Sequence, residues 1–451
     1  MQPMGHGRTL GVVGELDGQQ VGSAWVGLGP GGLGSASVGE ASAGAIGRPV
    51  IAGLVTAVVG FAASFAVVLA GLRNVGATPE QAASGLLAVT IAMGLASMAL
   101  ASTTRIPVTI AWSTPGAALL ASIAGLQGGW PAAVGAFMMT GLLLAAIGLI
   151  GPLGRLARAI PLNLANAMLA GVLLPLCLAP VRGLEQAPAM VGVLILVWVL
   201  LIALAPRWAA PGVLAAALAL AATSPEVRGL GPSAWIPSVT WTSPSLDLAA
   251  VVSVALPLLV VTMASQNIPG IAVLASFGYV APFRRAMVVT GLGTAAAAPL
   301  GAHAINLAAI SAALAAGPEA GPDRSRRWIA AVTAGGAWVL IGIGSAGVVA
   351  LALAAPGGLI EAAAGLALIP TIAGALRAAF GGGLPGRADL PAAATFLVAV
   401  SGLHPWGIGS AFWGLAIGLG MAAALRPRLE RRQTAPTDQA HLAGADPTSR
   451  P

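Results

Sequence analysis

Charged side chains are scarce in this chain of 451 residues. They make up 8% of the sequence, against roughly 25% in soluble globular proteins. Hydrophobic residues make up 57%, and the mean hydropathy is +0.91. A surface with so little charge cannot be solvated by water, so we expect most of the chain to lie in a lipid bilayer. The sequence therefore predicts an all-α polytopic membrane protein.

Lysine is absent, and all 21 basic residues are arginine. The formal net charge of +7 would suit a nucleic-acid partner if the positive charges were gathered in one patch. The arginines are instead scattered singly or in pairs between apolar runs. This placement is typical of membrane topology, and no nucleic-acid partner is expected.

Cysteine occurs once, at Cys177 inside an apolar stretch. A single cysteine excludes a disulfide framework, a CxxC redox motif and a cysteine-based metal cluster. The sequence also lacks a Walker A motif, a zincin motif, a nucleophile elbow and a P-type phosphorylation motif. We therefore expect no enzyme, no cofactor and no metal site.

Long apolar runs occupy the chain between a Gly/Ser-rich N-terminal tail (1–48) and a cytoplasmic C-terminal tail (427–451), both expected to be disordered. A transmembrane helix needs about 20 mostly apolar residues. This criterion gives about fourteen transmembrane segments, some of them short or broken. The predicted segments are 49–72, 81–103, 107–125, 131–151, 160–181, 188–205, 209–224, 245–268, 284–298, 299–316, 327–350, 358–378, 390–403 and 405–425.

The arginines fix the orientation of these segments. With the N-terminus in the cytoplasm, fifteen arginines fall on the inner side, four of them directly after the last segment, and three fall on the outer side; the N-terminal tail and the far C-terminus are not counted. Such a bias is the positive-inside rule, and it predicts that both termini are cytoplasmic.

The two halves of the chain have matching layouts. Residues 49–226 and 245–426 each give seven segments, separated by an extracytoplasmic linker at 227–244. The second half therefore starts on the opposite side of the membrane, which is the inverted repeat of many secondary transporters. The third segment of each half is broken: it reads IPVTIAWSTPGAALLASIAG in the first half and AAAAPLGAHAINLAAISAALAAG in the second. We expect each to combine a short extended stretch with a half-helix, because irregular backbone at membrane depth lines a cavity or is buried in protein.

The STPG motif of the first broken segment suggests an anion site without a charged side chain. Ser113 or Thr114 can cap a helix whose first residue is Pro115, with Gly116 next. The free N–H groups and positive dipole end of this half-helix would then face the cavity. The alternative is a plain helix break packed by its neighbours.

His303 and Asn306 are the polar residues of the second broken segment. Pro299 and Gly301 are expected to end an extended piece, after which a half-helix would carry His303 and Asn306 on one face. A buried neutral imidazole can donate to a carboxylate or accept a proton in passing. The alternative is a core histidine bonded to a backbone carbonyl.

A third polar cluster, Ser265 to Asn267, lies in the sequence TMASQNIPG. Pro269 and Gly270 follow it, so we expect the first span of the second half to end there. Polar side chains in hydrocarbon need partners. Gln266 and Asn267 are candidate substrate ligands, with helix–helix hydrogen bonding as the alternative.

Several long motifs resemble the benzoate/proton symporter family of the BenE type. They include AWSTPGAALL (111–120), VVTMASQNIPGIAVL (260–274) and GAHAINLAAISAALAAGPEAGPD (301–323), and the resemblance extends from about residue 49 to 426. Ala302 departs from the family pattern, which has a second glycine there. The family is distantly related to nucleobase permeases and anion exchangers with seven-plus-seven inverted repeats.

This resemblance implies import of benzoate, or a similar aromatic carboxylate, with a proton across a bacterial inner membrane. It implies a core domain of segments 1–4 and 8–11, a gate of segments 5–7 and 12–14, and substrate between short antiparallel strands of segments 3 and 10. Gln266 and His303 stand where nucleobase permeases have acidic residues, which suits an anionic substrate. A homodimer follows only by family analogy.

Proton coupling also has an energetic argument. Moving one anion inward against the membrane potential costs roughly 2.3 kcal/mol per 100 mV, and a proton carried with it removes that cost. His303 is the proton-coupling candidate, and a proton carried on the substrate itself is the alternative. The other functional hypotheses are transport of another small organic acid, a nucleobase or an inorganic anion, channel behaviour, and a membrane scaffold or receptor without transport.

Overall fold

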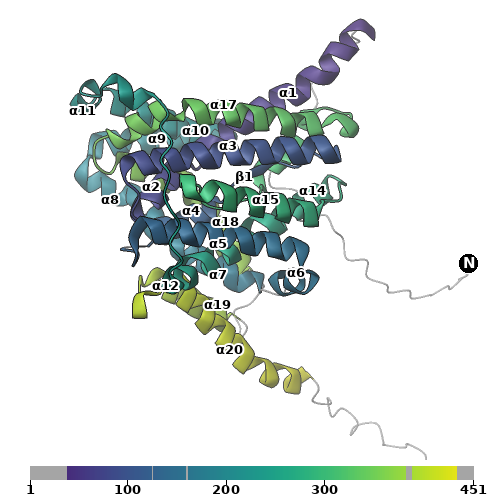
Figure 1. The fold of residues 1–451 in the computed structure, drawn as a ribbon, viewed down its shortest axis with the longest axis vertical. Coiled ribbons are helices and arrows are strands. Elements are labelled where there is room, and N and C mark those ends of the chain that lie inside the picture. The colour runs from purple at the N-terminus through teal and green to yellow at the C-terminus, as the bar shows by residue number, and fades with distance from the viewer. Residues whose placement is uncertain (1–37, 124, 159–160, 382–388, 434–451) are drawn as a thin grey trace, which may run out of the picture. The chain divides into compact units, whose positions relative to one another are not determined.

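The computed structural model describes residues 38–123, 125–158, 161–381 and 389–433 (Figure 1). By its internal contacts the chain divides into residues 1–43 and 44–451, and the second unit holds the site discussed below. Helix α1 begins at Val38 and helix α20 ends at Gln433. The inner ends of both predicted tails are therefore helical, while the rest of each tail lies outside the described residues.

The elements follow the predicted segments closely. The first half contains α1 (Val38–Ala62), α2 (Phe65–Asn74), α3 (Pro79–Thr104), β1 (Ile110–Trp112), α4 (Thr114–Ala121), α5 (Gly129–Leu149), α6 (Gly151–Arg158), α7 (Leu162–Cys177), α8 (Ala179–Gln186), α9 (Pro188–Leu204), α10 (Ala209–Ala222) and α11 (Pro225–Arg228). The second half contains α12 (Leu248–Ala250), α13 (Leu256–Thr262), α14 (Ile268–Ser276), α15 (Phe283–Ala297), β2 (Ile305–Leu307), α16 (Ile310–Ala316), α17 (Trp328–Leu353), α18 (Leu359–Phe380), α19 (Leu390–Val400) and α20 (Ser410–Gln433). Within the described residues, seven helices are long and apolar enough to cross a membrane.

Local sequence signals explain where these helices start and stop. The hydroxyl of Thr78 accepts a hydrogen bond from the N–H of Gln81, and the Gln81 side chain accepts one from the N–H of Thr78. With Pro79 in the first turn, this capping box begins α3. The helix ends at Arg105, which adopts a left-handed conformation with φ of 55°.

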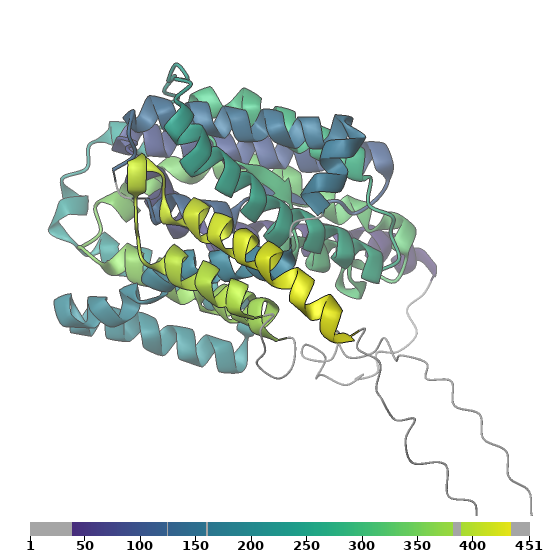
Figure 2. The ribbon, with the colours of Figure 1, turned by 90° about the horizontal axis from the view of Figure 1, so that it is seen from below.

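The packing of the helices obeys the inverted repeat. Helix α3 of the first half packs on α17 of the second, and the pair related to it by the repeat, α15 of the second half and α5 of the first, packs in the same way (Figure 1). Likewise α2 contacts α4 as α14 contacts α16, and α9 contacts α10 as α19 contacts α20. The antiparallel pair α19 and α20 is clearly seen in Figure 2. Each half thus places its segments against the equivalent partners, as the predicted two-fold relation requires.

Two matched glycine pairs allow the closest of these contacts. A Cβ added at Gly94 would lie 2.6 Å from the carbonyl oxygen of Gly335, and one added at Gly335 would lie 2.6 Å from that of Gly94. In the same way, a Cβ added at Gly141 or at Gly291 would lie 2.6 Å from the carbonyl oxygen of the other glycine. Small residues let helix backbones approach in a membrane, and here they do so at equivalent places in the α3–α17 and α5–α15 contacts.

The first span of the second half does not end where the sequence suggested. The helical stretch runs from Leu248 to Ser276, through Asn267 and past Pro269. Met263–Asn267 forms a π-helical turn, with a second such turn at Val251–Ala255. The wider turn loosens the hydrogen-bond ladder just before Pro269, which has no N–H to donate. The prediction that the proline ends this span was therefore wrong.

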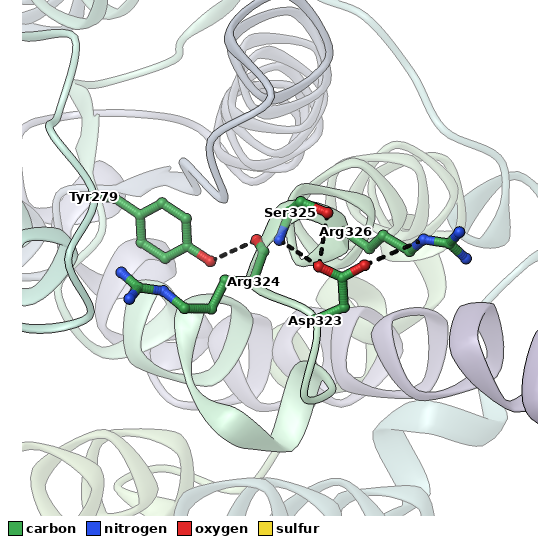
Figure 3. A network of polar contacts seen from close by, with 5 residues as sticks. All are labelled: Tyr279, Asp323, Arg324, Ser325 and Arg326. Carbon is green, nitrogen blue, oxygen red and sulfur yellow. Dashed lines mark hydrogen bonds and ion pairs between the residues drawn. The ribbon is translucent and has the colours of Figure 1, made fainter.

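A network of hydrogen bonds and one ion pair lies in the loop between α16 and α17 and joins it to the segment that follows α14 (Figure 3). The hydroxyl of Tyr279, just beyond α14, donates to the carbonyl oxygen of Arg324 at 2.8 Å. Asp323 accepts hydrogen bonds from the N–H and hydroxyl of Ser325 and pairs with Arg326 at 3.4 Å. The bonds from Ser325 lower the pKa of Asp323. The Tyr279–Arg324 hydrogen bond therefore connects the segment after α14 to the segment before α17.

Candidate functional site

Two short strands from opposite halves meet in the interior of the protein. Strands β1 and β2 are antiparallel, with Ala111 opposite Asn306. The ladder continues beyond the strands, since Ser113 donates to the carbonyl oxygen of Ala304 at 2.9 Å and Ala308 donates to that of Thr109 at 3.0 Å. The structure thus contains the extended stretch and the half-helix predicted for each broken segment, with α4 following β1 and α16 following β2.

Hydroxyl and amide side chains accept hydrogen bonds from the backbone N–H groups at the outer edges of this strand pair. The N–H of Ile110 donates to the hydroxyl oxygen of Ser97 on α3 at 2.8 Å, and that of Ile305 donates to Thr294 on α15 at 3.0 Å. Because α3 and α15 are equivalent segments, the two halves use the same device. Backbone groups buried in the interior of a membrane protein cannot form hydrogen bonds to water, so these side chains supply the hydrogen bonds instead.

Asn267 and Asn306, both predicted as substrate ligands, make hydrogen bonds to this strand pair. Asn267 is fully buried, and its Oδ1 accepts from the N–H of Leu307 at 2.9 Å. In its hydrogen-bonded orientation, the amide of Asn306 donates to the Leu307 carbonyl oxygen at 2.9 Å and accepts from the Ser113 N–H at 3.1 Å. These bonds hold the strands in register. A direct role of either residue in binding substrate stays a prediction.

Ser113 is the N-cap of α4, one of the two residues the sequence offered for that role. Its fully buried hydroxyl accepts from the N–H of Gly116 at 3.1 Å and lies 2.9 Å from the hydroxyl of Thr262. Gly116 is packed tightly, since a Cβ there would collide with Leu258 and with Ser113 itself. The α4 N–H that finds no hydrogen-bond partner among the described residues is that of Thr114.

The expected helical face carrying His303 and Asn306 is not formed. Pro299 lies in a 3-10 turn that ends at Gly301 with φ of +93°, His303 follows outside any helix, and Asn306 is the centre of β2. The half-helix α16 begins only at Ile310. An i,i+3 pair fits one face of a helix, but here the hydrogen bonds offered to β2 by surrounding elements favour the extended conformation.

His303 is completely buried. Its ring interacts with the backbone of Ser113, but neither ring nitrogen makes a hydrogen bond of normal geometry among the described residues. Gln266 lies half-buried in the π turn, and none of the described residues forms a hydrogen bond with its side chain. These two residues are therefore the predicted ligands whose side chains make no hydrogen bond of normal geometry among the described residues.

Ser64 belongs to the site but was not singled out from the sequence. It lies at the break between α1 and α2, where its hydroxyl oxygen accepts from the indole Nε1 of Trp112 at 2.7 Å and from the hydroxyl of Thr114 at 2.9 Å. Phe61 packs on Trp112 with 5.3 Å between ring centroids. A lone serine in an apolar span commonly bonds to its own helix, so GFAASFAVV carries no local signal of this arrangement.

A small cavity of about 10 Å³ lies beside Ser64. This is space for about one water molecule. The wall opposite the α1–α2 break is formed by Ala210 and Leu214 of α10 and by Ala363, Ala364 and Ala367 of α18. The cavity beside Ser64 thus adjoins helices from both halves of the chain.

Comparison with known proteins gives agreement at the level of family. Residues 46–424 match the family model BenE, described as "Benzoate membrane transport protein". The chain is 39% identical over 370 residues to the inner membrane protein YdcO of Escherichia coli (strain K12), which covers 82% of this chain and 93% of YdcO. It is 28% identical over 374 residues to the "Benzoate membrane transport protein" of Acinetobacter baylyi, with the same two coverages.

Solved structures support the same fold at low sequence identity. The transmembrane domain of the cyanobacterial bicarbonate transporter BicA is 14% identical, with a TM-score of 0.55, and the match covers 84% of this chain and 97% of that one. SLC26A9 is 12% identical, with a TM-score of 0.58, covering 84% and 66% of the two chains. These likenesses confirm the predicted fold class.

Proposed function

Because this chain belongs to the BenE family of benzoate membrane transport proteins, we propose that it imports benzoate, or a similar aromatic carboxylate, with a proton across a bacterial inner membrane. It is a membrane transporter and not an enzyme. The observation that carries the proposal is the meeting of β1, β2 and the capped N-terminus of α4 beside the hydroxyls of Ser64 and Thr114.

This arrangement suits an anion. The polar groups around the α4 N-terminus are hydroxyl, indole and backbone N–H groups, and none of the residues named in the site is acidic. Hydrogen-bond donors at a helix N-terminus stabilise negative charge, whereas a nearby carboxylate side chain would repel it. Gln266 and His303 add two side chains whose polar groups have no partner of normal geometry among the described residues.

The packing of the helices suggests how transport proceeds. The α3–α17 and α5–α15 contacts and the strand pair would form the core domain, and the α7–α18, α9–α10 and α19–α20 contacts would form the gate. Substrate would bind between the two, with both termini in the cytoplasm. The cavity beside Ser64 is too small for an aromatic ring, so this structure corresponds to a closed state that has to widen on binding.

Proton coupling makes uptake of the anion electroneutral. The inward movement of one negative charge costs roughly 2.3 kcal/mol per 100 mV of potential, and one accompanying proton cancels it. His303 is our candidate carrier, since an ionisable group buried at membrane depth is costly and typically functional.

Uptake by proteoliposomes tests the function directly. The purified protein is reconstituted, an outside-acidic pH gradient is imposed, and entry of labelled benzoate is followed against protein-free vesicles. We expect gradient-driven uptake that a protonophore abolishes. The absence of benzoate uptake would refute the substrate assignment, whereas uptake indifferent to the gradient would refute proton coupling alone.

A further inference from the structure

The hydroxyl of Ser64 has a proton that nothing in the described structure accepts. A serine hydroxyl offers one donor and two acceptor lone pairs, and an indole N–H can only donate. Both lone pairs of Ser64 are used, by Trp112 at 2.7 Å and by Thr114 at 2.9 Å. The residue is 4% exposed, so its remaining O–H is a buried donor without a partner among the described residues.

Ser64 also lines the cavity between the α1–α2 break and helices α10 and α18. Ser64 is the polar member of a lining whose other residues are alanines, Val67 and Leu214. The site therefore combines one hydrogen-bond donor with walls that are apolar and made mainly of small side chains. A ligand that matches it has an acceptor at one end and a flat apolar body.

We propose that Ser64 is a substrate-binding residue, whose O–H donates to the carboxylate of an aromatic acid while the alanines of α10 and α18 contact its ring. This assignment rests on the proposed function and names a residue that would recognise its substrate. A nucleobase carries donors and acceptors around its ring, and alanine walls would leave them unpaired at a cost. An inorganic anion would leave the apolar wall without a contact.

Once the cavity has widened to admit the substrate, the alanine wall would also set the size of the ring that fits. Ala367 of α18 lines the cavity and is half-buried, whereas Ala373, further along the same helix, is exposed. A larger side chain at position 367 would occupy the space of the ring. The same change at position 373 would not reach the cavity.

Binding of labelled benzoate to the purified full-length protein tests the role of Ser64. We expect Ser64→Ala to weaken binding about tenfold, the effect of losing one hydrogen bond to a charged group, and Ser64→Thr to retain most of the affinity. The matched control is Ser345→Ala, since Ser345 is equally buried but bonds only to Gly342 of its own helix at 2.7 Å. Its affinity should equal that of the wild type.

A second pair of variants keeps the proposal testable if Ser64→Ala does not fold. We expect Ala367→Leu to weaken benzoate binding and to weaken 4-methylbenzoate binding further, with Ala373→Leu unchanged. If folded Ser64→Ala, or Ala367→Leu in its place, binds both acids like the wild type, the Ser64 assignment is overturned and the proposed function stands. If the wild type itself binds no benzoate, the function and the assignment fall together.

Discussion

His303 combines two properties that rarely occur together in one side chain. It is completely buried, and neither of its ring nitrogens makes a hydrogen bond of normal geometry among the described residues. A charge on such a ring, without a partner at membrane depth, is costly. As the proposed proton carrier, His303 would take up its proton only in a state in which the surrounding elements have rearranged.

Replacement of His303 by a residue that cannot titrate should uncouple transport. We expect His303→Gln to fold and melt within a few degrees of the wild type, but to lose at least tenfold of its pH-gradient-driven benzoate uptake in proteoliposomes. His404→Gln is the control, because His404 is exposed and lies outside the strand pair. A normal response to the gradient in His303→Gln would contradict this role and indicate that the substrate itself carries the proton.

At the scale of single elements, the strand pair depends on side chains from neighbouring helices. Strands of three residues have little stability of their own. Here Ser97, Thr294 and Asn267 supply the hydrogen bonds that a wider sheet would otherwise provide. The π turn at Met263–Asn267 contains the residue that reaches the Leu307 N–H.

Two neighbours in this π turn should behave differently when truncated. Asn267→Ala leaves the buried N–H of Leu307 without a partner, and we expect a loss of about 1–3 kcal/mol in the free energy of unfolding. Gln266→Ala removes a half-buried side chain that bonds to none of the described residues, so its stability should match the wild type while its benzoate binding weakens. Thermal melting and ligand binding in detergent measure the two effects. Equal melting temperatures for the two variants would contradict this division.

Element boundaries show how far the sequence could predict this site. The cap of α4 was found because Ser113, Pro115 and Gly116 form a local signal. The conformation around His303 was not predicted, because the hydrogen bonds that determine it come from other helices. Asn267 lies 40 residues before Leu307, and Ser64 lies 48 residues before Trp112. Contacts of this kind leave no periodic pattern in the chain.

At the scale of the whole molecule, the inverted repeat determines which loops face which side. The equivalent helix pairs and the matched glycine contacts support a second half that repeats the first upside down. The positive-inside distribution of arginines then predicts that both termini are cytoplasmic. This orientation is open to direct measurement.

Single cysteines should report the orientation. In a Cys177→Ala background, which removes the native thiol, we expect Ile236→Cys to react with a membrane-impermeant maleimide in intact cells. Val280→Cys should react only after the membrane is permeabilised. Both positions are well exposed in the structure, at 66% and 87%, so access depends on the side of the membrane. The reverse pattern would place the termini outside.

The bond from the Ser84 hydroxyl to the carbonyl oxygen of Leu300 spans 216 residues of sequence, and this distance has a consequence for synthesis. Ribosomes add about 5–20 residues per second, so roughly 10 to 40 s pass between the two residues. During that interval β1 lacks β2, and α3 lacks the glycine surface of α17. The first half must therefore wait in the membrane as an unfinished structure, and shielding of its polar and small-residue faces during translation is a requirement of this fold.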